Sequence, residues 1–297
     1  MSFKNPPEIT VAAAANGQKK AYLPADKALV GAFLAGAYIA FGGMVAIAVS
    51  SGLDPKTWGT LPTLFTGSVF ALGLILVVLA GSELLTGNMA LVPLAVFTRR
   101  ASVPRMLGNF TIVLIGNLLG SLFVAYFLAV KTGVVTAELP LARLTSIAQG
   151  KALTETDLQI FLRAMGCNWL VCLAVWMSLA AEDVAGKVLA IFFPIMAFVA
   201  LGFDHVVANM FFLPAAIFAH VPGISWWDAI HNWIFAFLGN LVGAALFVAA
   251  AYWYLYARDA DHESAGGVPT APLAAGEGNG RFSSFEPSDR TGTAPSA

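Results

Sequence analysis

The chain has 297 residues, of which 11% are charged and 58% are hydrophobic, and its formal net charge at pH 7 is −1. Soluble globular proteins carry about 25% charged and about 45–50% apolar residues, so this composition excludes a soluble enzyme. The high apolar content also excludes a disordered chain, and the near-zero net charge gives no reason to expect a nucleic-acid partner. The class that remains is an integral membrane protein, all-α, with the lipid bilayer around it.

Long stretches without charged side chains recur along the sequence and predict six transmembrane helices. A spanning helix needs about 20 apolar residues. The second and fifth predicted spans are each interrupted by ionisable residues, the second at Glu83 and the fifth at Asp204 and His205. The six spans are predicted at 28–53, 57–98, 106–130, 164–181, 188–227 and 229–257.

The residues outside the spans predict the orientation of the chain. Residues 1–27 are polar and lack the short apolar core of a signal peptide, so we expect a cytoplasmic N-terminal segment before a six-helix domain at 28–257. Eleven Lys and Arg residues then fall on the cytoplasmic side and five on the other, as the positive-inside rule requires. Residues 258–297, rich in Gly, Ala, Pro and Ser, predict a disordered cytoplasmic tail. The expected location is the cell inner (plasma) membrane, with both termini in the cytoplasm.

An internal repeat predicts the architecture. Residues 81–93 and 202–214 share glycine, an acid, Asn-Met and proline at an offset of 121, and the Gly-Asn pairs at 116–117 and 239–240 recur at an offset of 123. A duplicated unit of three spans starts its second copy on the opposite face of the membrane. The two halves therefore have inverted topology, a 3+3 arrangement that transporters use to build midplane sites on broken helices. We expect helices two and five to be broken.

The composition of the two breaks predicts how each half-helix begins. Each break has a glycine for chain reversal, a capping asparagine (Asn88 or Asn209) and a proline (Pro93 or Pro214) suited to a first helical turn. We therefore expect the half-helices to begin near these prolines. Their free N–H groups and positive dipole ends would favour an anion, although a neutral solute could use the same device.

Glu83, Asp204 and His205 are the ionisable side chains within the spans proper, where charge is costly, whereas His220 and His231 flank the loop after the fifth span. Glu83 and Asp204 occupy equivalent repeat positions, and we expect them to accept hydrogen bonds from the freed N–H groups of the breaks, with proton relay as the alternative. His205 has no counterpart, because Leu84 stands at the equivalent position. A histidine at mid-pore would offset part of the cost of dehydrating an anion, or hand the anion a proton.

These segments closely resemble the formate/nitrite transporter family over residues 20–257. The resemblance is carried by residues 70–76, 81–88, 167–177 and 202–210 and by the two Gly-Asn pairs. It implies an aquaporin-like fold and a homopentamer with one pore per protomer. It also implies passage of small monovalent anions of weak acids, such as formate, nitrite or hydrosulfide, with protons as coupled partners.

The resemblance further implies roles for individual residues. His205 looks like the central pore histidine, with Thr86 as its hydrogen-bond partner and Asn232 as the polar residue beside it. Lys151 looks like the lysine that draws anions into the outer vestibule. The residues that would line two hydrophobic constrictions are Phe70, Leu74, Leu84, Leu85, Val171 and Phe198.

A channel or proton-coupled transporter for formate or nitrite is therefore the leading hypothesis. A hydrosulfide-type member of the family and an aquaporin-like pore for neutral solutes are the alternatives. The Asn-Met pairs that begin at Asn88 and Asn209 stand where aquaporins carry Asn-Pro-Ala, but the missing proline and the central His205 argue against that pore. The spans contain no nucleophile–base pair and no His-Glu-x-x-His motif, so we expect no catalytic residue, metal or cofactor.

Overall fold

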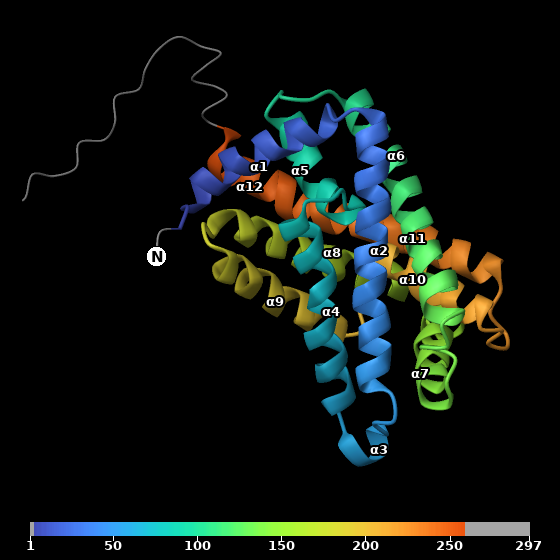
Figure 1. The fold of residues 1–297 in the computed structure, drawn as a ribbon. Coiled ribbons are helices and arrows are strands. Elements are labelled where there is room, and N and C mark those ends of the chain that lie inside the picture. The colour runs from blue at the N-terminus through green and yellow to red at the C-terminus, as the bar shows by residue number, and fades with distance from the viewer. Residues whose placement is uncertain (1–2, 259–297) are drawn as a thin grey trace, which may run out of the picture.

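A computed structural model describes residues 3–258 of the chain, and this part is almost entirely helical (Figure 1). The expected tail is, apart from Arg258, outside the described residues. The helices of the first half are α1 (Pro6–Ala21), α2 (Ala25–Ser50), α3 (Pro55–Trp58), α4 (Leu61–Ala80), α5 (Leu85–Phe97), α6 (Val103–Phe123) and the π-helix η1 (Val124–Val130). Those that follow are α7 (Glu138–Gln149), the π-helix η2 (Gly150–Thr154), α8 (Asp157–Ala180), α9 (Val184–Ala200), α10 (Val206–Phe218), α11 (Trp226–Ala244), the π-helix η3 (Ala245–Ala250) and α12 (Ala251–Tyr256).

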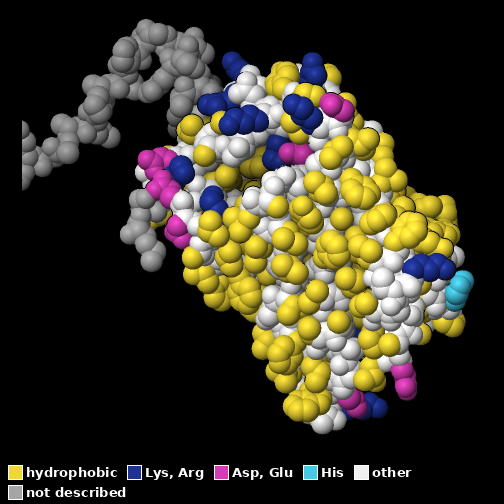
Figure 2. Space-filling model, viewed as in Figure 1, with side chains coloured by type: hydrophobic (Ala, Val, Ile, Leu, Met, Phe, Trp, Pro, Cys, Tyr) yellow, Lys and Arg dark blue, Asp and Glu magenta, His cyan; other side chains and the backbone are white. Residues whose placement is uncertain are grey.

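Five helical segments of residues 3–258 are long and apolar enough to cross a membrane. They are α2, α4, α6 with η1, α8, and α11 through α12, which match five of the six predicted spans. The predicted fifth span is divided between α9 and α10, each too short to cross alone, so the count of six stays a prediction. In Figure 2, apolar side chains cover most of the visible face between its ends, and charged side chains gather toward the two ends.

At both places where breaks were predicted, one helix ends and the next begins a few residues later. Between α4 and α5 the chain reverses at Gly81 (φ 79°), and between α9 and α10 it reverses at Gly202 (φ 70°). Both glycines have the left-handed backbone that other residues avoid. The predicted start of each half-helix was wrong, however. Pro93 lies inside α5 and Pro214 inside α10, each eight residues after the helix begins, because side chains described below fix the start instead.

Glycines let the first and third long helices of each half approach closely. A Cβ atom on Gly120 of α6 would lie 1.9 Å from the Phe33 carbonyl oxygen of α2. At the equivalent place in the second half, a Cβ on Gly243 of α11 would lie 2.2 Å from the Met165 carbonyl oxygen of α8. Close backbone contact at small residues is how membrane helices pack. The two halves thus repeat the same helix–helix contact.

Within residues 3–27, helix α1 packs against the bundle. Helix α1 packs across one end of it, where a Cβ on Gly17 would lie 1.8 Å from the Leu91 carbonyl oxygen of α5. Helix α12 lies at the same end as α1, whereas α3 and α7 lie at the other (Figure 1). The described ends of the chain therefore share one side of the molecule.

Candidate functional site

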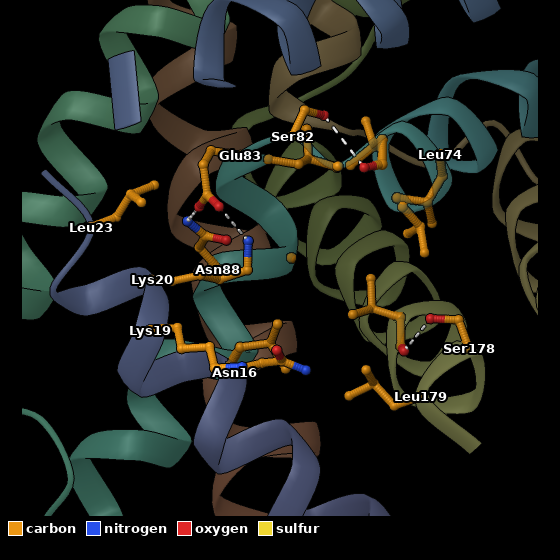
Figure 3. Close-up of a pocket in the computed structure, with 17 residues that line it drawn as sticks. Asn16, Lys19, Lys20, Leu23, Leu74, Ser82, Glu83, Asn88, Ser178 and Leu179 are labelled. Atoms are coloured by element: carbon orange, nitrogen blue, oxygen red, sulfur yellow. Dashed lines mark hydrogen bonds and ion pairs between the residues drawn. The ribbon is translucent and has the colours of Figure 1, made fainter. Parts of the chain in front are cut away.

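Three cavities lie between the helices and share lining residues. The first, of about 310 Å³, is next to α1 and includes Lys20, Glu83 and Asn88 (Figure 3); we call it the α1 cavity. The second, of about 210 Å³, is lined from α7 and η2 and includes Arg143 and Lys151; we call it the α7 cavity. The third, the central cavity, holds only about 10 Å³, about the space for one water molecule.

Apolar side chains separate the central cavity from the other two. It shares Leu74 and Leu84 with the α1 cavity, and it shares Phe70, Phe198 and His205 with the α7 cavity. The three cavities therefore form a row with a narrow, mostly apolar segment in the middle. Of the six residues expected at constrictions, Phe70, Leu74, Leu84, Val171 and Phe198 line the central cavity. The sixth, Leu85, is buried but lines none of the three cavities.

His205 and Thr86 meet between the two breaks. His205 Nε2 lies 2.8 Å from Thr86 Oγ1, and both side chains are buried. His205 is also the N-cap of α10, where its Nδ1 accepts a hydrogen bond from the Ala208 N–H at 3.0 Å. A ring nitrogen that accepts from a backbone N–H carries no proton, so the neutral ring has its hydrogen on Nε2 and donates to Thr86 Oγ1. The hydroxyl hydrogen of Thr86 is then available to another acceptor.

Asp204 is at the centre of a polar cluster beside the α7 cavity. Its Oδ1 accepts from Lys151 Nζ at 2.7 Å and from Asn209 Nδ2 at 2.8 Å. Asn209 Nδ2 also donates to Asn232 Oδ1 at 2.8 Å, and Asn232 Nδ2 donates to the Lys151 carbonyl oxygen at 3.2 Å. Asn232 therefore hydrogen-bonds within this cluster and not to His205, the residue beside which we expected it.

The same connections recur beside the α1 cavity (Figure 3). Glu83 Oε1 accepts from Lys20 Nζ at 2.9 Å, and Glu83 Oε2 accepts from Asn88 Nδ2 at 2.9 Å. Asn88 Nδ2 also donates to Asn109 Oδ1 at 3.0 Å, and Asn109 Nδ2 donates to the Lys20 carbonyl oxygen at 3.0 Å. Beside each cavity there is thus a cluster of a lysine, an acid and two asparagines bonded in the same order. The role of Lys20 was not predicted from the sequence.

Asparagines, and not the acids, satisfy the freed N–H groups of the breaks. Asn117 Oδ1 accepts from the Leu85 N–H at 2.9 Å, and Asn240 Oδ1 accepts from the Val206 N–H at 2.9 Å. The hydrogen bonds predicted for Glu83 and Asp204 were wrong, because both carboxylates instead take charge-assisted bonds from a lysine. The repeated Gly-Asn pairs at 116–117 and 239–240 were the sequence signal for these anchors.

The α7 cavity has more basic than acidic side chains. Lys151, Arg143 and Arg163 line it together with one acid, Glu155, and Asp204 is bonded to Lys151 behind it. Arg143 donates to the hydroxyls of Ser50 and Thr66, and no carboxylate of residues 3–258 forms an ion pair with it. Burial lowers the pKa of Arg143 below its ordinary value. A cavity with this balance of charge attracts anions. The part played by Arg143 and Glu155 was not predicted from the sequence.

The helical bundle, its apolar spans and its row of cavities define a membrane protein of the channel or transporter class. A family model described as formate/nitrite transporter matches residues 7–254. Among curated relatives, an uncharacterized transporter, YrhG, of Bacillus subtilis is 51% identical over 86% of this chain and 95% of its own. A probable formate transporter of Methanothermobacter thermautotrophicus is 45% identical over 87% of this chain and 99% of its own.

A solved structure described as a pentameric formate channel with formate bound superposes with a TM-score of 0.69 and 31% identity. It covers 78% of this chain and 97% of its own. The family match spans most of the chain and both relatives are aligned over nearly their full length. The chain therefore belongs to the formate/nitrite transporter family.

Proposed function

We propose that this protein moves formate and nitrite, small monovalent anions of weak acids, through a pore in each protomer of a homopentamer. The protein would lie in the cell inner membrane with both termini cytoplasmic, so that the α1 cavity faces the cytoplasm and the α7 cavity faces outward. The observation that carries the proposal is the His205–Thr86 pair, which lies between two cavities that each contain a lysine. The formate channel that superposes on the chain supports both the substrate and the pentamer.

The row of cavities suggests how an anion crosses. The cations of the α7 cavity raise the local concentration of anions at its mouth. The central cavity, of about 10 Å³, is too small for a hydrated ion, so the anion must leave its water behind and the side chains around it must move. Losing hydration is costly for a charge. The hydroxyl of Thr86, oriented by the ring of His205, is the buried donor that offsets part of this cost.

Two roles are proposed for His205, hydrogen bonding in the pore and proton transfer to the anion, and its hydrogen bonds favour the first. Its Nδ1 already accepts from the Ala208 N–H, so a second ring proton requires that the start of α10 opens. The proton on Nε2 belongs to a neutral ring, and giving it away would leave an imidazolate anion inside the protein. We therefore assign His205 the role of hydrogen-bond donor and orienter of Thr86. A proton that accompanies the anion must come from another group.

Flux through proteoliposomes tests the proposal. Purified protein should pass formate and nitrite, and a series with hydrosulfide and acetate ranks the substrates. Thr86→Val removes a hydrogen bond to a charged solute that is worth about 1.5–3 kcal/mol, so anion flux should fall by about 10- to 100-fold. Thr86→Ser should retain most of it. Thr111→Val, which changes an exposed threonine on α6, is the matched control.

Two outcomes would change the assignment. Water or glycerol flux without anion flux would overturn the anion pore in favour of a neutral-solute pore. Hydrosulfide flux that exceeds formate and nitrite flux would place the chain with the hydrosulfide-type members. The oligomeric state is tested separately by native mass spectrometry, in which a mass other than five chains would overturn the pentamer.

A further inference from the structure

Two carboxyl groups, one of which lines the α7 cavity, face each other. Glu155 follows η2, and Asp204 lies in the break between α9 and α10; their side chains are within hydrogen-bonding reach of each other. One oxygen of each is occupied, since Glu155 Oε1 binds Arg163 and Asp204 Oδ1 binds Lys151 and Asn209. The other two oxygens, Glu155 Oε2 and Asp204 Oδ2, are buried and have no hydrogen-bond partner.

This geometry is unfavourable for two ionised carboxylates. Both groups would carry negative charge in contact, and ionised carboxylates are acceptors only, so neither could satisfy the other. A single proton held between them removes one charge and supplies the missing donor for both buried oxygens. Burial, and then the contact with Asp204, raise the pKa of Glu155 to about 7. The pair is therefore suited to bind a proton near neutral pH.

We propose that Glu155 and Asp204 together form a proton-binding site beside the α7 cavity, and that a proton bound there strengthens anion binding in this cavity. The effect of the proton on anion binding rests on the proposed function. The groups that face the pair are Lys151 on η2, Arg163 and Cys167 on α8, and Arg143 across the cavity on α7. Without the shared proton the cavity's three cations oppose two negative charges; with it they oppose one. An anion and a proton then favour each other's binding by the same factor.

The competing explanation is that Glu155 only anchors Arg163. The two explanations differ in what Glu155→Gln does. A glutamine keeps an oxygen for Arg163, and its amide N–H can donate to Asp204 Oδ2, so it imitates the proton-loaded pair at every pH. Glu155→Asp shortens the side chain by one methylene and withdraws the carboxyl from Asp204. Glu138→Gln on the exposed surface of α7 removes a nearby acid that lies outside the cavity and is the matched control.

Infrared difference spectroscopy of the full chain in lipid nanodiscs reads the proton directly. The wild-type protein and Glu138→Gln should show a carboxylic-acid carbonyl band that disappears with a midpoint near pH 7. Glu155→Gln should lack this band, and Glu155→Asp should shift its midpoint toward the ordinary range of an aspartate, about 4. A wild-type spectrum without such a band, or a band that persists in Glu155→Gln, overturns the proton site.

Formate uptake from the α7 side tests the linkage to the anion. The wild-type KM should rise by about tenfold as the outer pH passes through the midpoint, because one nearby charge is added. Glu155→Gln should keep the low, acid-side KM throughout, and an unchanged wild-type pH profile in this variant would overturn the linkage. The spectrum does not depend on transport. A titrating band without formate flux would therefore refute the proposed function alone, and flux without the band would refute the proton site alone.

Discussion

Removing the Asn240 side chain tests how the second break is held. Asn240 Oδ1 accepts from the Val206 N–H at 2.9 Å, and its Nδ2 donates to the carbonyl oxygens of Ala164 at 2.8 Å and Asp204 at 2.9 Å. One side chain thus ties α11 to α8, to the break and to the first turn of α10. Asn240→Ala breaks all three hydrogen bonds and leaves the Val206 N–H, which has no partner within its own helix, unsatisfied.

The expected loss follows from the value of hydrogen bonds in membrane proteins. Each side-chain bond contributes about 0.6 kcal/mol on average and about 1.7 kcal/mol at most, since the unfolded chain in the membrane also finds partners. Three bonds at a fully buried site therefore predict that Asn240→Ala lowers the free energy of unfolding by about 2–4 kcal/mol. Asn117→Ala removes the equivalent three bonds of the first break and should cost about the same.

Unfolding in mixed micelles with increasing dodecyl sulfate, followed by circular dichroism, measures these differences. Thr111→Ala is the control, because its exposed hydroxyl bonds only to the Leu107 carbonyl of its own helix. This control should change the free energy by less than about 0.5 kcal/mol. If Asn240→Ala stays within that margin, the asparagine is not an anchor, and another interaction holds the start of α10.

Three more predictions concern packing, charge and pH. Gly120→Ala must push α2 from α6, since the added carbon would lie 1.9 Å from Phe33 O, and should cost at least about 2 kcal/mol in the same unfolding assay. Gly108→Ala, with open space around it, should change little. Lys20→Met leaves the largely buried Glu83 without its cation and should destabilise by about 3 kcal/mol, whereas Lys56→Met on exposed α3 should not. Because the pKa of Glu155 is raised from 4.5 to about 7, the folded chain holds this proton more tightly than the unfolded chain. Stability should therefore fall as pH rises between these values and level off above them, a slope that Glu155→Gln should abolish in melts taken across this range.

The repeat in the sequence was enough to predict the two places where one helix ends and the next begins, and which residues lie there. Gly81 and Gly202 both have positive φ at these turns. They could be predicted because the pattern of a glycine two residues before an acid is local and appears twice. The prolines misled the prediction of the helix starts. A proline fits a first turn, but it is also tolerated inside a buried membrane helix where neighbours re-satisfy the freed carbonyl, and the local sequence does not distinguish these two cases.

The partners of the charged residues could not be predicted from local pattern. Lys20 reaches Glu83 across 63 residues, and Lys151 reaches Asp204 across 53. Neither lysine lies in a repeated motif, so only the packing of α1 and η2 against the breaks brings each to its acid. The same holds for Arg143, whose hydroxyl partners come from α2 and α4. The sequence predicted the pair His205–Thr86 only through its resemblance to a family.

The two halves of the molecule differ at His205 and at the proposed proton site. Beside both cavities a lysine, an acid and two asparagines are bonded in the same order, so this shared arrangement cannot distinguish one side of the membrane from the other. At the first residue before the half-helix, however, α5 has Leu84 and α10 has His205. Of the two acids in the breaks, moreover, Asp204 has a second acid, Glu155, in contact with it, whereas Glu83 has its two oxygens bonded to Lys20 and Asn88. A symmetric scaffold therefore carries the proposed proton site on one side alone, and the side that carries Glu155 is the side on which pH should control anion entry.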